Sequence, residues 1–172
     1  MSFWDHLEAM RWMLIKCIAV LVIATGLGLV FTNNVSEVLQ RPLQAISPSV
    51  ELIFSAPLDA FVARVKLGIL AGIILSIPFL LYFIWGFIAP GLHARERRVA
   101  WIAIISGSIM FVLGVTFGYR LLFFGLPAVV NMGLHDARHL WSLRSYLDFC
   151  FRFLLAFGVI FELPVVLVAL GR

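Results

Sequence analysis

Glu162 is the residue whose chemistry fits its surroundings least, because it stands inside the apolar stretch 153–171. An ionisable side chain far from the ends of such a stretch is costly, so Glu162 is a candidate functional carboxyl. Pro164 follows in the motif FELP, and its missing N–H and its ring leave the carbonyl of Ile160 without a helical partner. The motif predicts a polar notch at one depth of an apolar helix. The alternative is a structural carboxyl, protonated and hydrogen-bonded to a neighbouring helix.

A second candidate carboxyl, Glu96, stands in the segment APGLHARERR, in which Pro90 and Gly91 predict the end of the preceding helix. Its basic neighbours are Arg95, Arg97 and Arg98. One interpretation is a solvated loop that anchors the chain at the membrane surface. The other is that Glu96, held by these arginines, is a docking carboxylate for a cationic peptide.

Other reactive side chains carry little signal. His135, Asp136 and His139 have a spacing that could bind a metal, but the set has low specificity and we predict no metal site. Cys17 and Cys150 are expected to behave as small hydrophobic residues. The sequence holds no nucleophile elbow, phosphate-binding loop, HExxH or CxxC motif, so it does not predict an enzyme.

The composition places the chain in a membrane. Of its 172 residues, 63% are hydrophobic and 13% are charged, and the mean hydropathy is +1.07. A soluble domain has about a quarter charged residues, so this chain could not form a water-facing surface. The net charge is +4. Its basic residues are scattered singly between apolar runs, which favours anchoring at the bilayer surface over nucleic-acid binding.

The few charges divide the chain into four expected transmembrane helices. Uncharged runs cover residues 17–36, 67–94 and 99–119, and Glu162 alone interrupts the last run, 153–171. Each is long enough to cross a hydrocarbon core of about 30 Å. The expected spans are residues 13–32, 66–89, 99–124 and 147–170, with loops at 33–63, 90–98 and 126–145.

The density of basic residues favours a cytosolic N-terminus. Three arginines lie in the short loop 90–98, whereas the charges expected on the other side are spread over two long segments. Short loops count most in the positive-inside rule. The segments 33–63 and 126–145 are then external, and the prolines and the alternating run VELIFS in the first of them predict short helices with an extended piece. Pro78, inside the second span, predicts a kink.

Four separated sequence pieces together resemble the TatC family, the receptor subunit of the twin-arginine protein translocase. These pieces are WDHLEAMR, PLDAFVARVKLG, SIPFLLYFIWGFIAPGLHARERR and FGVIFELPV. They extend over nearly the whole chain in the family's order, and FIAPGLxxxERR together with FELPV is the most specific part of the match.

The resemblance implies an all-α integral membrane protein whose four helices are the first four of a six-helix bundle shaped like a cupped hand. It implies a multi-pass protein of a prokaryotic inner membrane that takes part in Sec-independent transport of folded proteins, driven by the proton-motive force and with no cofactor. The implied partners are twin-arginine signal peptides, TatA and TatB-type single-span subunits, the lipid bilayer and possible further TatC copies.

The resemblance also assigns roles to individual positions. The residues that it implies for signal-peptide binding are Glu8, Arg11, Glu96, Arg97 and Arg98. Those that it implies for docking of a partner subunit are Glu162, Pro164, Tyr119 and Phe87. Pro78 and Pro90 are implied to shape the backbone.

The chain departs from the family pattern at several points. Ala9 stands where the N-terminal motif usually has a second carboxylate, Phe83 replaces a common glutamine, and Phe124 replaces a common proline. The sequence stops at Arg172, where the fourth family helix should end, so the chain is either a fragment of a longer protein, which we expect, or a degenerate paralogue.

Two other interpretations of the residues stay open at this level. In one, the chain is a small secondary transporter or proton-pathway component in which Glu162 and the Pro164 notch form the ion site. No second FELP-like element is present, as a transporter built from repeated halves would ordinarily show. In the other, the chain is an inert membrane scaffold.

Overall fold

The computed structural model describes residues 3–44, 52–53, 56–88, 97–131 and 141–170. Its elements are α1 (Phe3–Val30), α2 (Thr32–Gln44), β1 (Leu52–Ile53), α3 (Asp59–Ile88), α4 (Arg97–Asn131), β2 (Trp141–Ser142) and α5 (Leu143–Leu170). The four longest helices, α1, α3, α4 and α5, are each long and apolar enough to cross a membrane. The expected all-α membrane fold with four spans is therefore confirmed.

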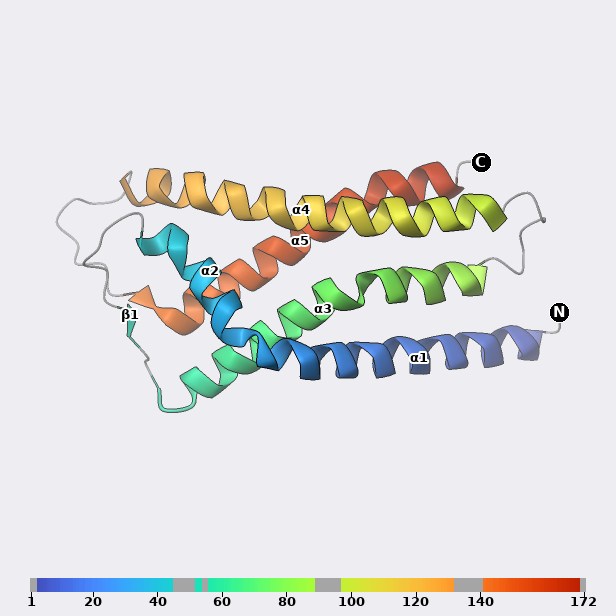
Figure 1. Ribbon diagram of the computed structural model, residues 1–172, viewed down its shortest axis with the longest axis horizontal. Coiled ribbons are helices and arrows are strands. Elements are labelled where there is room, and N and C mark those ends of the chain that lie inside the picture. Colours follow the sequence, from blue (N-terminus) through green and yellow to red (C-terminus); the bar gives the residue numbers. More distant parts are fainter. Residues whose placement is uncertain (1–2, 45–51, 54–55, 89–96, 132–140, 171–172) are drawn as a thin grey trace.

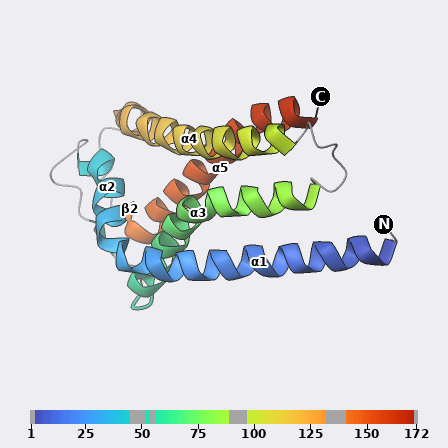
Figure 2. The same ribbon diagram turned by 45° about the vertical axis from the view of Figure 1, so that its right-hand side comes forward.

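The four long helices form two antiparallel pairs. Figures 1 and 2 show α1 lying along α3, and α4 lying along α5. We call one end of the bundle the capped end; it consists of α2, the two strands and residues 59–67, 119–128 and 143–150. The opposite, uncapped end consists of residues 6–14, 81–87, 101–107 and 162–168, and both chain termini lie on its side (Figure 1).

The helices are longer than the expected spans. α3 begins at Asp59 rather than at residue 66, α4 ends at Asn131 rather than at 124, and α5 begins at Leu143 rather than at 147. The 35 residues of α4 extend for about 52 Å at 1.5 Å per residue, which exceeds a hydrocarbon core of about 30 Å. Charged residues therefore mark where a helix leaves the hydrocarbon, and the helix itself continues. The segment 33–63 does contain a short helix and an extended piece, as expected.

Close packing of α1 on α3 requires glycine at two facing positions. A Cβ atom on Gly28 would collide with the carbonyl oxygen of Gly68, and one on Gly72 would stand 2.7 Å from the Cα atom of Thr25. Small residues let two membrane helices approach until their backbones touch.

α3 also continues through Pro78 and changes direction along its length (Figures 1 and 2), which agrees with the expected kink.

The main buried core lies at the capped end and joins four helices. Its buried members are Leu39 and Leu43 of α2, Ala63, Leu67 and Leu70 of α3, Leu122 and Leu126 of α4, and Leu143, Tyr146, Leu147, Cys150 and Leu154 of α5. α4 continues through Pro127 at this core, although a proline removes one helical hydrogen bond and its ring crowds the carbonyl four residues back. Cys150 is fully buried in this core and behaves as the expected small hydrophobic residue.

Two tyrosine side chains, one from α4 and one from α5, form hydrogen bonds to the backbone of α2 across this core. Pro42 lies inside α2 and has no N–H to donate to the carbonyl of Val38. Instead, the hydroxyl of Tyr119 donates to that carbonyl at 3.0 Å, and the hydroxyl of Tyr146 donates to the carbonyl of Leu39 at 2.6 Å. Side chains of α4 and α5 thus bind backbone oxygens of α2, which fixes this helix against the end of the bundle.

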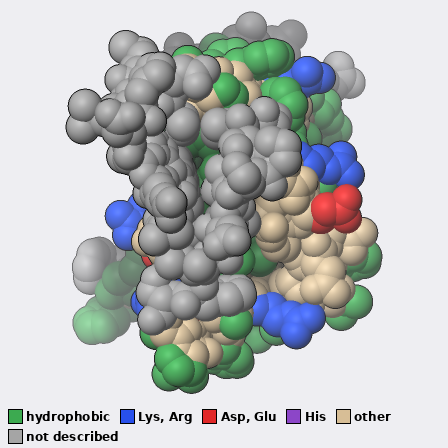
Figure 3. Space-filling model, turned by 90° about the vertical axis from the view of Figure 1, so that its left-hand side faces the viewer, with side chains coloured by type: hydrophobic (Ala, Val, Ile, Leu, Met, Phe, Trp, Pro, Cys, Tyr) green, Lys and Arg blue, Asp and Glu red, His purple; other side chains and the backbone are tan. Residues whose placement is uncertain are grey.

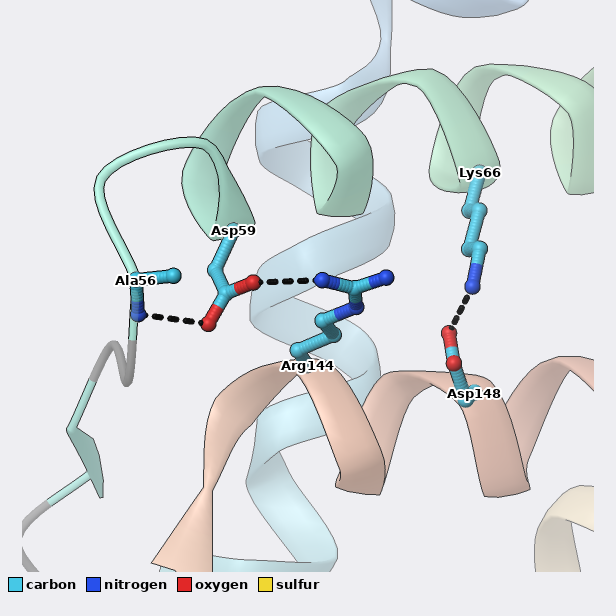
Figure 4. A network of polar contacts seen from close by, with 5 residues as sticks. All are labelled: Ala56, Asp59, Lys66, Arg144 and Asp148. Atoms are coloured by element: carbon cyan, nitrogen blue, oxygen red, sulfur yellow. Dashed lines mark hydrogen bonds and ion pairs between the residues drawn. The ribbon is translucent and has the colours of Figure 1, made fainter.

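Ion pairs join α3 to α5 at the same end (Figure 4). The carboxylate of Asp59 accepts the backbone N–H of Ala56 at 2.9 Å and a guanidinium N–H of Arg144 at 2.7 Å. The first contact is the carboxylate half of a capping box, made across the turn of residues 56–59 that leads into α3. Two turns further along α3, Lys66 pairs with Asp148 at 2.5 Å.

Only 3% of the Asp59 side chain is exposed. Burying a carboxylate is costly unless it is paired and hydrogen-bonded, and here both of its oxygens have partners.

The two strands pair in parallel beside this network, with Leu52 opposite Trp141 and Ile53 opposite Ser142. Viewed onto the capped end, the molecule shows Lys and Arg side chains spread between hydrophobic and uncharged groups (Figure 3).

Candidate functional site at Glu162

Glu162 lies within the span Leu143–Val168 of α5, where its carboxyl group rests against α4. A Cβ atom built on Gly107 of α4 would stand 2.9 Å from Oε2 and 3.4 Å from Oε1 of Glu162. The side chain is half-buried, and Oε1 is buried without a hydrogen-bond partner among the described residues. The structure thus places a carboxyl group between two apolar helices and leaves one of its oxygens unpaired.

The hydroxyl groups next in sequence to Gly107 are engaged elsewhere. Ser106 donates its hydroxyl to the carbonyl of Ala103 at 3.4 Å, and Ser108 donates to the carbonyl of Ile104 at 2.8 Å. Both acceptors belong to α4 itself, so these serines do not serve Glu162. An unsatisfied buried polar group costs about 1–3 kcal/mol.

An apolar cluster from three helices lies next to the carboxyl along α3, α4 and α5. Trp85 of α3 forms a buried cluster with Ala103 and Ile104 of α4, and Leu81 and Val165 pack against it. Leu81 reaches the same point as Glu162, since its Cδ1 atom would stand 3.0 Å from a Cβ atom on Gly107. We call this meeting point of Leu81, Gly107 and Glu162 the three-helix junction. Its apolar walls strengthen any hydrogen bond formed there.

The outer side of the junction is exposed and apolar. Ile160 is 52% exposed and Leu163 is 53% exposed on either side of Glu162, and Pro164 is exposed as well. Within the helix, the proline frees the carbonyl of Ile160. Ile160 points to the opposite side of α5 from Glu162, whereas the exposed Val159 and Val166, three residues before and four residues after Glu162, share its face. A transmembrane segment packed over that face would meet apolar side chains beside the carboxyl group. This arrangement suits binding of a polar group within the membrane.

The structure describes only part of the expected signal-peptide set. Glu8 and Arg11 are exposed on α1. Arg97 and Arg98 begin α4, whereas Glu96 and Pro90 lie outside the described residues. His135, Asp136 and His139, where we predict no metal site, lie outside them too.

One ring contact places the start of α1 beside the end of α3. The ring centroids of His6 and Phe87 are 4.7 Å apart. Glu8 therefore lies at the same end of the bundle as the last residue of α3, Ile88. The helix α4, whose first residue is Arg97, begins at this uncapped end as well (Figure 1). Expected signal-peptide residues from α1 and α4 therefore share one end of the molecule.

The expected docking residues do not form one cluster. The Phe87 ring packs against His6, and Tyr119 binds the carbonyl of Val38 at the capped end. Tyr119 is 12 residues beyond Gly107 on α4, a distance of about 18 Å along a helix. Only Glu162 and Pro164 remain together. In this structure the Tyr119 hydroxyl forms a hydrogen bond to the backbone of α2.

Sequence reasoning missed the residues that surround Glu162. Gly107 is one of 13 glycines, and nothing in its local sequence distinguishes it from the others. Leu81 lies one helical turn from Pro78 but looks like any apolar span residue. The sequence signal that could have pointed to Gly107 is the need for a small residue wherever a polar side chain must fit between two membrane helices.

The fold and the site define a polytopic helical membrane protein whose candidate site is suited to binding within the bilayer. A family model described as Sec-independent protein translocase protein (TatC) matches residues 5–172. The chain belongs to the TatC family. This is a family of protein-translocation components and not of enzymes, which favours the translocase interpretation over the transporter.

Individual relatives agree with the family match. A Sec-independent protein translocase protein TatC of Aquifex aeolicus is 33% identical, with 100% of this chain and 73% of that protein covered. The Escherichia coli protein of the same name is 32% identical, with 96% of this chain and 65% of that protein covered. The chain thus spans about two thirds to three quarters of their length.

A solved structure has the same fold. A crystal structure of a twin arginine translocase receptor, TatC, matches with a TM-score of 0.84 at 32% identity, covering 96% of this chain and 74% of that chain. A second crystal structure of such a receptor, in DDM, gives a TM-score of 0.88.

Proposed function

We propose that the chain acts in the receptor of a Sec-independent translocase, with Glu162 as the docking group for a partner helix in the membrane. The observation that carries this proposal is the buried, unpartnered Oε1 of Glu162 on a fold shared with a twin arginine translocase receptor. A group that costs stability and satisfies nothing within the described chain is expected to serve a binding partner.

The docking partner is a TatA or TatB-type single-span subunit. Such a helix fits the exposed apolar face of α5 that Glu162 shares with Val159, Leu163 and Val166. A polar side chain at the depth of Glu162 would exchange a hydrogen bond with the carboxyl group. In an apolar environment such a bond between helices is worth about 1–2 kcal/mol, which is enough to select the depth and rotation of the partner.

Binding of twin-arginine signal peptides belongs to the uncapped end. Glu8 is exposed there, and Glu96 precedes the first residue of α4. A carboxylate binds the planar fork of a guanidinium through two parallel hydrogen bonds, whereas the ammonium group of lysine cannot reproduce this geometry. In this proposal Glu96 and Glu8 contact the arginine pair, Arg97 and Arg98 hold Glu96, and Arg11 completes the binding set. The N-terminus is then cytosolic and the membrane is the inner membrane.

Crosslinking to two signal peptides tests this assignment. A photoreactive group placed beside Glu96 should label a peptide containing an arginine pair far more strongly than its twin containing two lysines. Glu96→Gln should reduce the labelling of the arginine peptide to that of the lysine peptide. Glu37→Gln, at an exposed position on α2, serves as the matched control and should change neither. Equal labelling of both peptides by the unaltered chain would refute the receptor proposal.

A further inference from the structure

The carboxyl group of Glu162 packs against α4 at Gly107, which has no side chain to occupy that space. A Cβ atom there would stand 2.9 Å from Oε2 of Glu162 and 3.0 Å from Cδ1 of Leu81. Gly107 is buried, although its neighbours Ser106 and Ser108 are only half-buried. The absence of a side chain at residue 107 therefore lets the carboxyl lie flat on α4 at the three-helix junction.

We propose that Gly107 is a positioning residue that sets the direction of the Glu162 carboxyl and thereby the docking of a polar partner group. This inference rests on the proposed docking role of Glu162 and adds a second residue to it. A methyl group at position 107 would turn the carboxyl outward, away from the three-helix junction. The hydrogen bond offered to a partner would then form at another height and angle.

Two other glycines of α4 distinguish positioning from packing. At Gly114, a Cβ atom would stand 2.6 Å from the backbone carbonyl oxygen of Phe157, so a side chain there must separate α4 from α5. At Gly107, the atoms approached are the ends of two side chains, which can rotate. At Gly125, nothing lies within 4 Å. Position 107 therefore provides a positioning variant, and position 125 provides a neutral control on the same helix.

The test measures binding of two single-span peptides to the chain in lipid nanodiscs. One peptide carries a glutamine at the depth of Glu162, and its twin carries leucine there. Binding is followed by energy transfer for the unaltered chain and for Gly107→Ala, Gly125→Ala, Glu162→Ala and the double variant Gly107→Ala with Glu162→Ala. Thermal unfolding of each variant is recorded alongside.

We expect Gly107→Ala to weaken binding of the glutamine peptide about tenfold and to leave binding of the leucine peptide unchanged. Gly125→Ala should change neither. Glu162→Ala should remove the preference for glutamine, and adding Gly107→Ala to it should have no further effect. If Gly107→Ala destabilises the fold, combining it with Glu162→Asp provides a second test, since the shorter side chain withdraws from residue 107 and should restore part of the preference.

The outcomes separate the inference from the proposal on which it rests. Loss of the glutamine preference in Glu162→Ala but not in Gly107→Ala would overturn the positioning role and leave docking intact. Equal weakening of both peptides by Gly107→Ala would show a packing role and would also overturn it. A glutamine preference that persists in Glu162→Ala would overturn docking at this carboxyl and the positioning role with it.

Discussion

The two ends of the bundle differ in whether their buried polar groups have hydrogen-bond partners. At the capped end, both oxygens of Asp59 have partners, and the carbonyl freed by Pro42 receives the hydroxyl of Tyr119. Towards the uncapped end, Oε1 of Glu162 is buried without a partner among the described residues. The buried carboxyl group of Asp59 thus has hydrogen-bond partners for both oxygens, whereas that of Glu162 has an oxygen without one among the described residues.

This difference separates a structural role from a binding role. Paired groups at the capped end hold α2, α3, α4 and α5 in one arrangement. An unpaired group lowers stability and is expected only where a partner completes it. Experiments that remove one group from each end should therefore have opposite effects on the free energy of unfolding.

The largest loss of stability is expected from Asp59→Ala. The variant removes the capping hydrogen bond to Ala56 and the hydrogen bond from Arg144. The expected cost is about 3 kcal/mol, the sum of a helix cap and a charged hydrogen bond. Unfolding in mixed micelles would measure it.

The control for Asp59→Ala is Glu37→Ala, which removes an ion pair in which 58% of the Arg41 side chain and 69% of the Glu37 side chain are exposed. Its cost should stay below about 0.5 kcal/mol. Similar losses in the two variants would contradict the importance of burial at the capped end.

A smaller loss is expected from Tyr119→Phe, which removes the hydroxyl that binds the carbonyl of Val38. The expected cost is about 1 kcal/mol. Pro42→Ala should reduce this cost, because alanine supplies the backbone N–H that proline lacks. A double-mutant cycle on the free energy of unfolding measures the coupling. Additive effects would show that Pro42 is not the reason for the tyrosine contact.

The positions of the charged residues in the sequence predict much of the fold. They do not predict which residues pair with one another across a long stretch of sequence. The uncharged runs predict four spans, and the structure has four. The helix that contains the second expected span begins at Asp59, seven residues before that span, and its charged residues Asp59 and Lys66 are paired with Arg144 and Asp148, more than 80 residues away in sequence. A charge with such a partner does not end a helix. Sequence alone cannot show these pairings.

The site was predictable only in part for the same reason. Glu162 and Pro164 stand out because a carboxyl and a proline are unusual inside an apolar run. Gly107 does not, since its importance comes only from lying opposite Glu162. Tyr119 and Phe87 follow from the family resemblance, but the structure places their side chains against Val38 and His6.

The most direct test of the account is Glu162→Met, read for stability and for docking in the same preparation. Methionine has a similar volume and no unsatisfied polar atom. The account predicts that the free energy of unfolding rises by about 1–3 kcal/mol, while the preference for a glutamine-bearing single-span peptide over its leucine twin disappears. A variant that is less stable than the unaltered chain and still prefers the glutamine peptide would contradict the account.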